Sequence, residues 1–245
     1  MKQDKKIIFT IKDLSKSFGS KDVLKDVSFD IYEGEILCVI GRSGIGKSVL
    51  IKHLNGLLEP NKGKVIYNGK NISDLKHSDI YSLRKKVAML FQSGALFDSM
   101  NVEENLALPL LEHTSMKKAD ITREISEKLS LVGMEGIEKL HTSELSGGMK
   151  KRVALARAIM QSPEVLLYDE PTTGLDPVIS DIINDLILDM NSKYNLTSIV
   201  ITHDMRSVRK IADRVIMLHE GRIIFDGNIP EIEAADDLVI QQFIS

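Results

Sequence analysis

The sequence predicts an α/β fold in which helices cover a parallel sheet. One observation is the apolar run Ile36 to Ile40, which is followed by helical spacing of apolar residues over 48–57. A second is a pair of apolar segments, 165–168 and 197–202, separated by an amphipathic stretch. Runs that are apolar on both faces are typical of strands buried in a parallel sheet. The third observation is that 93–160 is mostly helical, which indicates a subdomain inserted between two strand-rich halves.

The remaining strands are expected on either side of this insertion. Residues 7–40 contain alternating apolar and polar stretches that end at glycine turns, and further strands are expected over 63–72 and 86–92. Residues 214–227 read as a closing hairpin that turns at Glu220-Gly221. The amphipathic stretch over about 178–192 is expected to be a helix.

These segments predict one domain over residues 1–228. Its core is expected over 1–92 and 161–228, its helical subdomain over 93–160, and a C-terminal tail without an assigned structure over 229–245. A chain of 245 residues is long enough for such a domain.

Composition excludes several classes of protein. The formal net charge of -3 offers no overall attraction to nucleic acid or anionic lipid. Cys38 is the only cysteine, so no intramolecular disulfide can form, and no Cys/His cluster predicts a zinc site. Its apolar neighbours predict an inert core thiol. Since no run of apolar residues approaches membrane-spanning length, we expect a cytoplasmic protein, and any membrane role must come through another subunit.

A glycine-rich loop between the first buried strand and the following helix predicts a nucleotide site. The segment matches the pattern G-x-x-x-x-G-K-[ST], and its residues are Gly41, Arg42, Ser43, Gly44, Ile45, Gly46, Lys47 and Ser48. Its glycines let successive main-chain N–H groups turn towards phosphate oxygens, and the helix N-terminus adds positive dipole. Lys47 would meet the outer phosphates of ATP, and the hydroxyl of Ser48 would ligate Mg²⁺.

Two acids end the apolar segment 165–168. A buried strand delivers Asp169 and Glu170 to the sheet edge where α/β proteins bind ligands. Asp169 is expected in the Mg²⁺ shell, and Glu170 is expected to orient and deprotonate the attacking water. His203 ends the next apolar strand at the same edge. The residue pattern alone leaves His203 open between a structural cap and a contact to the γ-phosphate.

Five further features, taken with this loop and these acids, resemble the ABC ATPases, and the resemblance covers nearly the whole chain. They are Phe18, Gln92 after a strand, the signature-like Leu145-Ser146-Gly147-Gly148-Met149, Gly174-Leu175-Asp176, and His203. The resemblance implies a P-loop NTPase of RecA-like core, with an antiparallel β subdomain and the inserted helical subdomain. It also implies that Phe18 stacks on adenine, that Gln92 contacts Mg²⁺ and the attacking water, and that His203 contacts the γ-phosphate.

The same resemblance implies a homodimer. In this family the signature loop of one subunit caps the ATP bound by the other, which assigns Ser146, Gly147 and Gly148 to the nucleotide of a second copy. Ser146 is also a good helix N-cap, and the glycines permit close approach of an anion. Lys150, Lys151 and Arg152 follow, and we expect them on a solvated helix face.

A narrower resemblance is to the Mla-type ATPases associated with MCE proteins. It rests on the segments 91–100, 102–105 and 168–177, and on Met149 in the signature. It implies a phospholipid or other hydrophobic substrate, an integral membrane permease, an MCE-domain partner, and a position on the cytoplasmic face of the inner membrane. It also places the permease contact after Gln92. The alternatives are another ABC branch, for amino-acid import or lipoprotein release, and a non-transport ABC protein acting on nucleic acid or ribosomes.

Overall fold

Two β-sheets form the framework of the computed structural model, which describes residues 6–245. The larger has six strands in the order β10-β9-β3-β8-β7-β6. Its strands are β3 (Ile36–Ile40), β6 (Val87–Leu90), β7 (Val165–Asp169), β8 (Thr197–Ile201), β9 (Arg214–His219) and β10 (Arg222–Gly227). All neighbouring pairs are parallel except β9 and β10, which form the expected hairpin. The predicted α/β fold with a parallel sheet is therefore confirmed.

The smaller sheet is antiparallel and has the strand order β2-β1-β4-β5. It comprises the long strands β1 (Ile7–Phe18) and β2 (Lys21–Tyr32), followed by β4 (Lys62–Tyr67) and β5 (Lys70–Asn71). The segment expected as one strand over 63–72 is thus two strands, because a turn with Asn68 and Gly69 at positive φ divides it.

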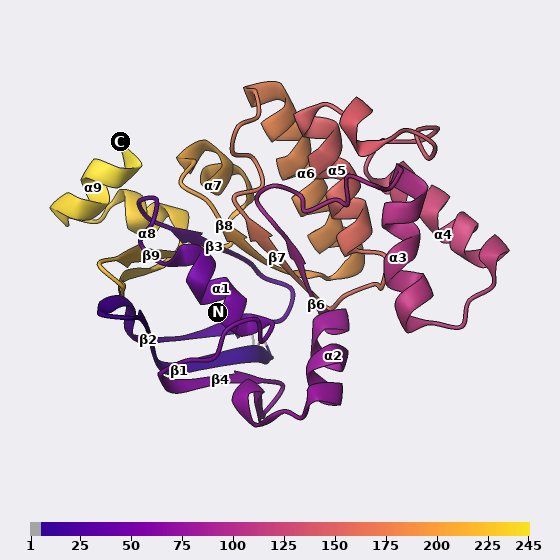
Figure 1. Cartoon of the computed structure of the whole chain (residues 1–245). Helices are drawn as coiled ribbons and strands as arrows, with labels where there is room; N and C mark the ends of the chain where they lie inside the picture. The colour runs from indigo at the N-terminus through magenta and orange to yellow at the C-terminus, as the bar shows by residue number, and fades with distance from the viewer. Residues whose placement is uncertain (1–5) are drawn as a thin grey trace.

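The helices up to residue 211 lie in the connections between the parallel strands, and those after residue 228 follow the last strand. They are α1 (Lys47–Leu54), α2 (His77–Lys86), α3 (Val102–His113), α4 (Lys118–Leu131), α5 (Gly147–Ala158), α6 (Pro177–Tyr194), α7 (Met205–Ile211), α8 (Ile229–Glu233) and α9 (Leu238–Ile244). Helices α3, α4 and α5 lie together on one side of the molecule, and α8 and α9 lie on the opposite side (Figure 1). We propose that 93–160 acts as one helical subdomain. Over residues 6–245, no helix combines the length and apolar character that crossing a bilayer requires.

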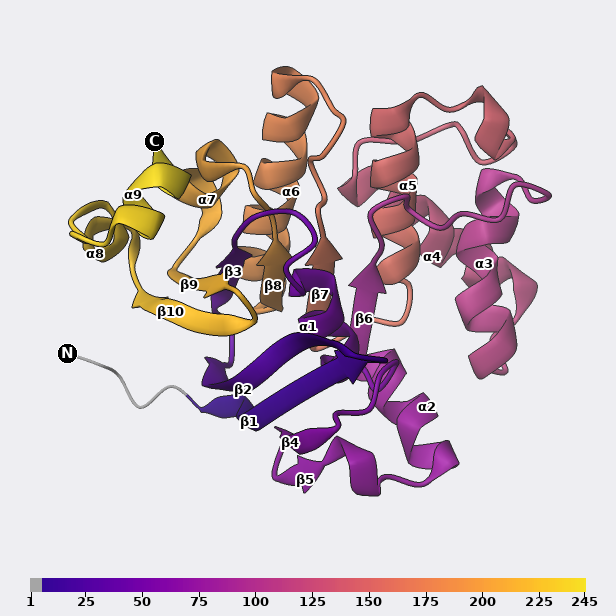
Figure 2. The same ribbon diagram turned by 60° about the vertical axis from the view of Figure 1, so that its left-hand side comes forward.

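Strand β3 separates two hydrophobic clusters. Leu37 and Val39 face the cluster that contains α1 and the antiparallel sheet, so that α1 is packed between the two sheets (Figure 2). Cys38 and Ile40 face the second cluster, which includes α5, α6 and the helices around them. This alternation explains why the strand is apolar on both faces. Cys38 is fully buried, which raises the pKa of its thiol far above the usual range.

The C-terminal segment over 229–245, expected as a tail, forms the short helices α8 and α9. Ile232, Ile240 and Ile244 are buried in the same cluster as α5 and α6. Arg209 of α7 stabilises this segment by two hydrogen bonds, because it donates to a carboxylate oxygen of Glu233 and to the main-chain oxygen of Ile244. The last residues of the chain are therefore part of the packed domain.

Candidate nucleotide site

The loop from Gly41 to Gly46 joins β3 to α1 and takes its shape from glycine. Gly41, Gly44 and Gly46 have φ angles of 143°, 78° and 112°, which other residues rarely adopt. At Gly41 an added Cβ would lie 2.4 Å from the main-chain oxygen of Leu218, and at Gly46 it would lie 2.8 Å from a methyl carbon of Val23. The loop therefore depends on glycine at 41 and 46 for space as well as for backbone freedom.

The side chain of Lys47 is buried beneath this loop. Its Nζ atom donates to the main-chain oxygens of Gly41 and Arg42 at 2.7 and 3.1 Å, and it lies 3.6 Å from Oε1 of Glu170. Burial lowers the pKa of the Lys47 ammonium group, and the charge of Glu170 opposes this shift. A positive charge is therefore held between the loop and the end of β7.

Ser48 and Asp169 meet across the same site. Ser48 is the second residue of α1, and Asp169 is the last residue of β7. The Ser48 hydroxyl donates to Oδ1 of Asp169 at 2.7 Å. Asp169 is buried and Ser48 is half-buried, so the two oxygen-bearing groups converge where solvent has only partial access.

Glu170 is the most heavily constrained residue of the site. Its φ angle of 52° lies in the left-handed region, which costs a non-glycine residue backbone energy. Its main-chain N–H donates to the oxygen of Ile201 at 2.9 Å, and its Oε2 atom accepts the hydroxyl of Thr173 at 2.7 Å. The same Oε2 atom lies 2.8 Å from Nδ1 of His203. The structure therefore brings His203 to the carboxylate of Glu170.

A cavity of about 460 Å³ opens over these groups. Phe18, about half exposed at the end of β1, lies at this cavity together with Gln92, which follows β6. The sequence-predicted residues that line it are Phe18, Ser43, Gly44, Gly46, Lys47, Ser48, Gln92, Glu170 and His203. Asp169 adjoins them through Ser48. An aromatic ring, a glycine-rich loop and the side chain of Glu170 therefore share one concave surface.

The signature residues lie elsewhere. Ser146 caps α5, because its hydroxyl accepts the main-chain N–H of Met149 at 3.3 Å. Added Cβ atoms at Gly147 and Gly148 would lie 3.8 Å from Leu175 and 2.6 Å from Ile179, so the loop packs closely against the start of α6. Ser146, Gly147 and Gly148 are not among the described residues that line the cavity.

The family model described as "ABC transporter" matches residues 24–173, a span that includes the loop, Gln92, the signature and both acids. The chain belongs to the ABC transporter family. It is 40% identical over 98% of its length to the "Probable ribonucleotide transport ATP-binding protein mkl" of Mycobacterium leprae, of which it covers 69%. It is 37% identical over 100% of its length to the "Intermembrane phospholipid transport system ATP-binding protein MlaF" of Escherichia coli K12, of which it covers 91%.

A solved structure extends the comparison to the reaction. The ATP-binding cassette MJ0796, described as a dimeric post-hydrolysis state bound to ADP and Pi, superposes with a TM-score of 0.84 and 29% identity. The match covers 91% of this chain and 99% of that one. The present chain is accordingly an ABC ATPase that binds ATP and hydrolyses it.

The sequence did not identify Lys151 of this ABC ATPase as a residue of the site. The prediction that Lys151 lies on a solvated helix face is wrong. Its side chain is only 7% exposed. Its Nζ atom donates to the main-chain oxygen of Gln92, and to that of Glu170 at 3.3 Å. Helical spacing offered a signal, because Gly148, Lys151 and Leu155 follow each other at i, i+3 and i+7 and all three are buried.

Proposed function

We propose that this ABC ATPase works as a homodimer that drives a membrane permease for phospholipid or another hydrophobic molecule. The observation that carries the ATPase part is the convergence on the Glu170 carboxylate of Lys47, Thr173 and His203, beside a cavity that Phe18 and Gln92 line. The choice of substrate class is supported by the name of MlaF, which assigns that relative to phospholipid transport.

Each part of the cavity suits one part of ATP. The exposed ring of Phe18 offers a stacking surface for adenine. The loop over 41–46 presents main-chain N–H groups and the N-terminus of α1 to the phosphates, with Arg42, Ser43 and Ile45 as its intervening residues. Lys47 supplies a buried positive charge for the outer phosphates.

The oxygen groups of Ser48 and Asp169 fit Mg²⁺, which prefers hard oxygen ligands and binds through one or two protein groups plus substrate phosphates. Ser48 and Asp169 would hold the ion, and the amide oxygen of Gln92 would complete its protein ligands. When bound, Mg²⁺ neutralises charge on the phosphates. Among residues 6–245 there is no group of three or more His, Cys, Asp and Glu side chains able to hold a metal ion, which fits an ion held largely by the nucleotide.

Hydrolysis is assigned to Glu170, with His203 and Gln92 beside it. The Glu170 carboxylate orients a water molecule and accepts its proton as that water attacks the γ-phosphorus. The bond from the γ-phosphorus to the β–γ bridging oxygen breaks in the same reaction, and ADP is the leaving group. His203 holds the carboxylate in place, and its exposed ring edge is available to the γ-phosphate. The carboxylate is positioned in advance by the hydroxyl of Thr173, so little reorganisation accompanies the reaction.

The dimer follows from the position of Ser146, Gly147 and Gly148. They start a helix whose N-terminus is favourable for an anion, yet they do not line the cavity of their own chain among the described residues. A second copy would bring them to the γ-phosphate. The dimeric description of MJ0796 supports this arrangement.

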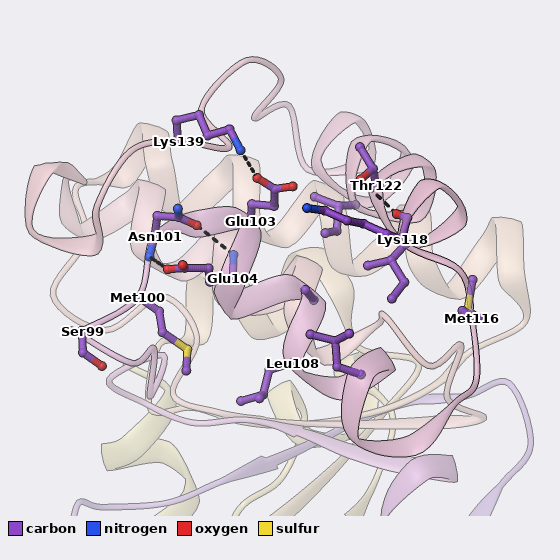
Figure 3. Close-up of a pocket in the computed structure, with 14 residues that line it drawn as sticks. Ser99, Met100, Asn101, Glu103, Glu104, Leu108, Met116, Lys118, Thr122 and Lys139 are labelled. Atoms are coloured by element: carbon purple, nitrogen blue, oxygen red, sulfur yellow. Dashed lines mark hydrogen bonds and ion pairs between the residues drawn. The ribbon is translucent and has the colours of Figure 1, made fainter.

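We assign the contact with the permease to the face that carries α3 and α4. A groove of about 850 Å³ lies there, with Met100 and Leu108 on one side and Met116 on the other (Figure 3). Phe97, 49% exposed, precedes the groove, and Leu111 is 63% exposed within it. Large exposed apolar side chains beside a groove are typical of binding sites for another protein. Attachment here would hold the subunit on the cytoplasmic face of the inner membrane, in a complex with an MCE-domain protein.

The Glu170→Gln variant tests the ATPase assignment. Loss of the base is expected to lower the rate of phosphate release by a factor of about 10² to 10⁴, while ATP binding persists. The matched control is Glu127→Gln on the exposed surface of α4, which should hydrolyse ATP normally. Turnover by Glu170→Gln equal to that of the control would refute the assignment.

The substrate class is tested in the reconstituted complex of this subunit with its permease. We expect ATP-dependent transfer of a fluorescent phospholipid between vesicles, and no transfer when the Glu170→Gln subunit is used. Because mkl is named for ribonucleotide transport, labelled ribonucleotide uptake is measured in the same vesicles. ATP-driven uptake of the ribonucleotide without phospholipid transfer would contradict the proposal.

A further inference from the structure

The buried ammonium group of Lys151 joins the ends of two strands at the nucleotide site. Gln92 and Glu170 follow β6 and β7, which are paired neighbours in the sheet, with Leu90 opposite Tyr168. Lys151 donates to the main-chain oxygens of both residues. A single side chain therefore fixes the separation between the two residues that the proposed function places at the attacking water.

The hydrogen bond from Lys151 to Glu170 restrains the main chain of Glu170. A left-handed φ of 52° persists at a non-glycine residue only where the surroundings determine it. The N–H of Glu170 is held by the oxygen of Ile201, and its C=O is held by Lys151. The N–H of Thr173 also donates to this oxygen at 3.3 Å, so Lys151 supplies one of three main-chain restraints on the residue whose carboxylate must face the water.

Helix α5 carries a second cation that holds the same loop. Arg157 donates to the main-chain oxygens of Gly94 and Ala95 at 3.2 and 2.8 Å. The segment that leaves Gln92 is therefore attached to α5 at two places, by Lys151 and by Arg157. Since Ser146 caps the same helix, the three motifs around Gln92, Glu170 and Ser146 are connected through one rigid element.

We propose that Lys151 is a positioning residue for ATP hydrolysis, which acts by holding the main chain of Gln92 and Glu170 so that their side chains face the same water molecule. This inference rests on the proposed role of Glu170. Asp169 and Glu170 lie near enough for their charges to oppose the fall in the Lys151 pKa that burial causes, so the ammonium form has acidic groups to stabilise it. Lys151 does not line the nucleotide cavity among the described residues.

The test compares Lys151→Met with Lys151→Arg and with the neighbouring control Lys150→Met. We expect Lys151→Met to lower kcat about 100-fold with little change in KM for ATP, because small displacements of catalytic groups have effects of that size. Lys151→Arg keeps the charge and several donors and should recover much of the rate. Lys150→Met should match the parent protein. A kcat unchanged in Lys151→Met, or a rise in KM alone, would overturn the proposal.

A double variant distinguishes a positioning role of Lys151 from a purely structural one. A residue that acts through Glu170 should cause no further fall in kcat when Lys151→Met is added to Glu170→Gln, because the two effects share one cause. Multiplied losses in the double variant would overturn the proposal. If Lys151→Met does not fold, Lys151→Gln undergoes the same two comparisons. Normal turnover by Glu170→Gln itself would instead refute the proposed function, so the two failures are distinguishable.

Discussion

His203 and Glu170 form a direct pair, with the Nδ1 atom of the imidazole 2.8 Å from the Oε2 atom of the carboxylate. The two residues follow neighbouring parallel strands, β8 and β7, whose ends meet at the same sheet edge. Glu170 is buried, whereas the side chain of His203 is 48% exposed. One nitrogen of the imidazole is therefore committed to the carboxylate, and His203 also lines the nucleotide cavity.

The first prediction concerns this pair. His203→Ala removes a partner of the Glu170 carboxylate, and we expect kcat to fall about 100-fold while ATP still binds. Phosphate release and equilibrium nucleotide binding are measured on the same preparation. His113→Ala, at an exposed position on α3, is the control and should behave as the parent protein. An unchanged kcat in His203→Ala would show that the pair is a structural cap.

A second prediction concerns ATP affinity. Lys47→Ala removes the buried charge assigned to the outer phosphates, and charged hydrogen bonds contribute about 1.5 to 3 kcal/mol. We expect ATP binding to weaken about 10- to 100-fold. Lys150→Ala, whose side chain lies outside the cavity, should bind ATP normally. Equal losses in the two variants, measured by titration with a fluorescent nucleotide, would refute the distinction between the site and the neighbouring surface.

The homodimer is tested by Ser146→Arg. The bulky cation should leave ATP binding by each subunit intact and abolish hydrolysis, because it blocks the approach of the signature loop to the partner's γ-phosphate. Mixing Ser146→Arg with Lys47→Ala subunits creates one interface with both defects and one with neither. Partial recovery of phosphate release in the mixture is the expected result. The mixed dimer is crosslinked in the same experiment to show that it has formed. A mixed dimer that forms but has no activity would contradict the hypothesis that the two nucleotide sites act independently.

Permease docking is tested by Phe97→Asp. Since Phe97 is 49% exposed, we expect the isolated subunit to keep its melting temperature and its ATP binding. Loss of the apolar anchor should prevent co-purification with the permease. Tyr194→Asp, on a similarly exposed ring at the end of α6, is the control and should join the complex. Normal assembly of the Phe97→Asp subunit would remove this residue from the docking surface.

The C-terminal helices give a prediction about stability. Ile240 is 3% exposed and Leu238 is 76% exposed, although both lie in α9. Truncation of a buried isoleucine to alanine typically costs about 2 to 5 kcal/mol, and exposed positions change stability by about 0.5 kcal/mol or less. Ile240→Ala should therefore lower the denaturant midpoint clearly, and Leu238→Ala should not. Equal midpoints would show that α9 contributes nothing to the folded domain.

Local patterns were enough to place the groups that meet at the cavity. The loop over 41–48 and the acids at the end of 165–170 each carry their own signal, and the rule that parallel strands end at one edge brings them together. The geometry of the described residues agrees with this expectation. Ser48 is hydrogen-bonded to Asp169, and Nζ of Lys47 lies 3.6 Å from Oε1 of Glu170, the residue that follows Asp169. The roles assigned to these residues remain predictions.

Lys151 and the C-terminal helices could not be predicted in the same way. A run of three basic residues usually lies in solvent. The carbonyls of Gln92 and Glu170, distant in sequence, and the nearby charges of Asp169 and Glu170 make the burial of Lys151 favourable. Helices α8 and α9 have 5 and 7 residues, which is too short for periodicity to identify them. They form because Ile232, Ile240 and Ile244 pack against the rest of the domain.

The single cysteine has a practical consequence for studying motion in this transporter. Thiol reagents react with the thiolate, and Cys38 combines complete burial with a strongly raised pKa. The native chain should therefore remain unlabelled by maleimides while it is folded. A cysteine introduced on an exposed position of α4 and another on α8 could then be coupled selectively to fluorophores, without replacing Cys38. Distances within a working dimer become measurable in the otherwise unaltered protein.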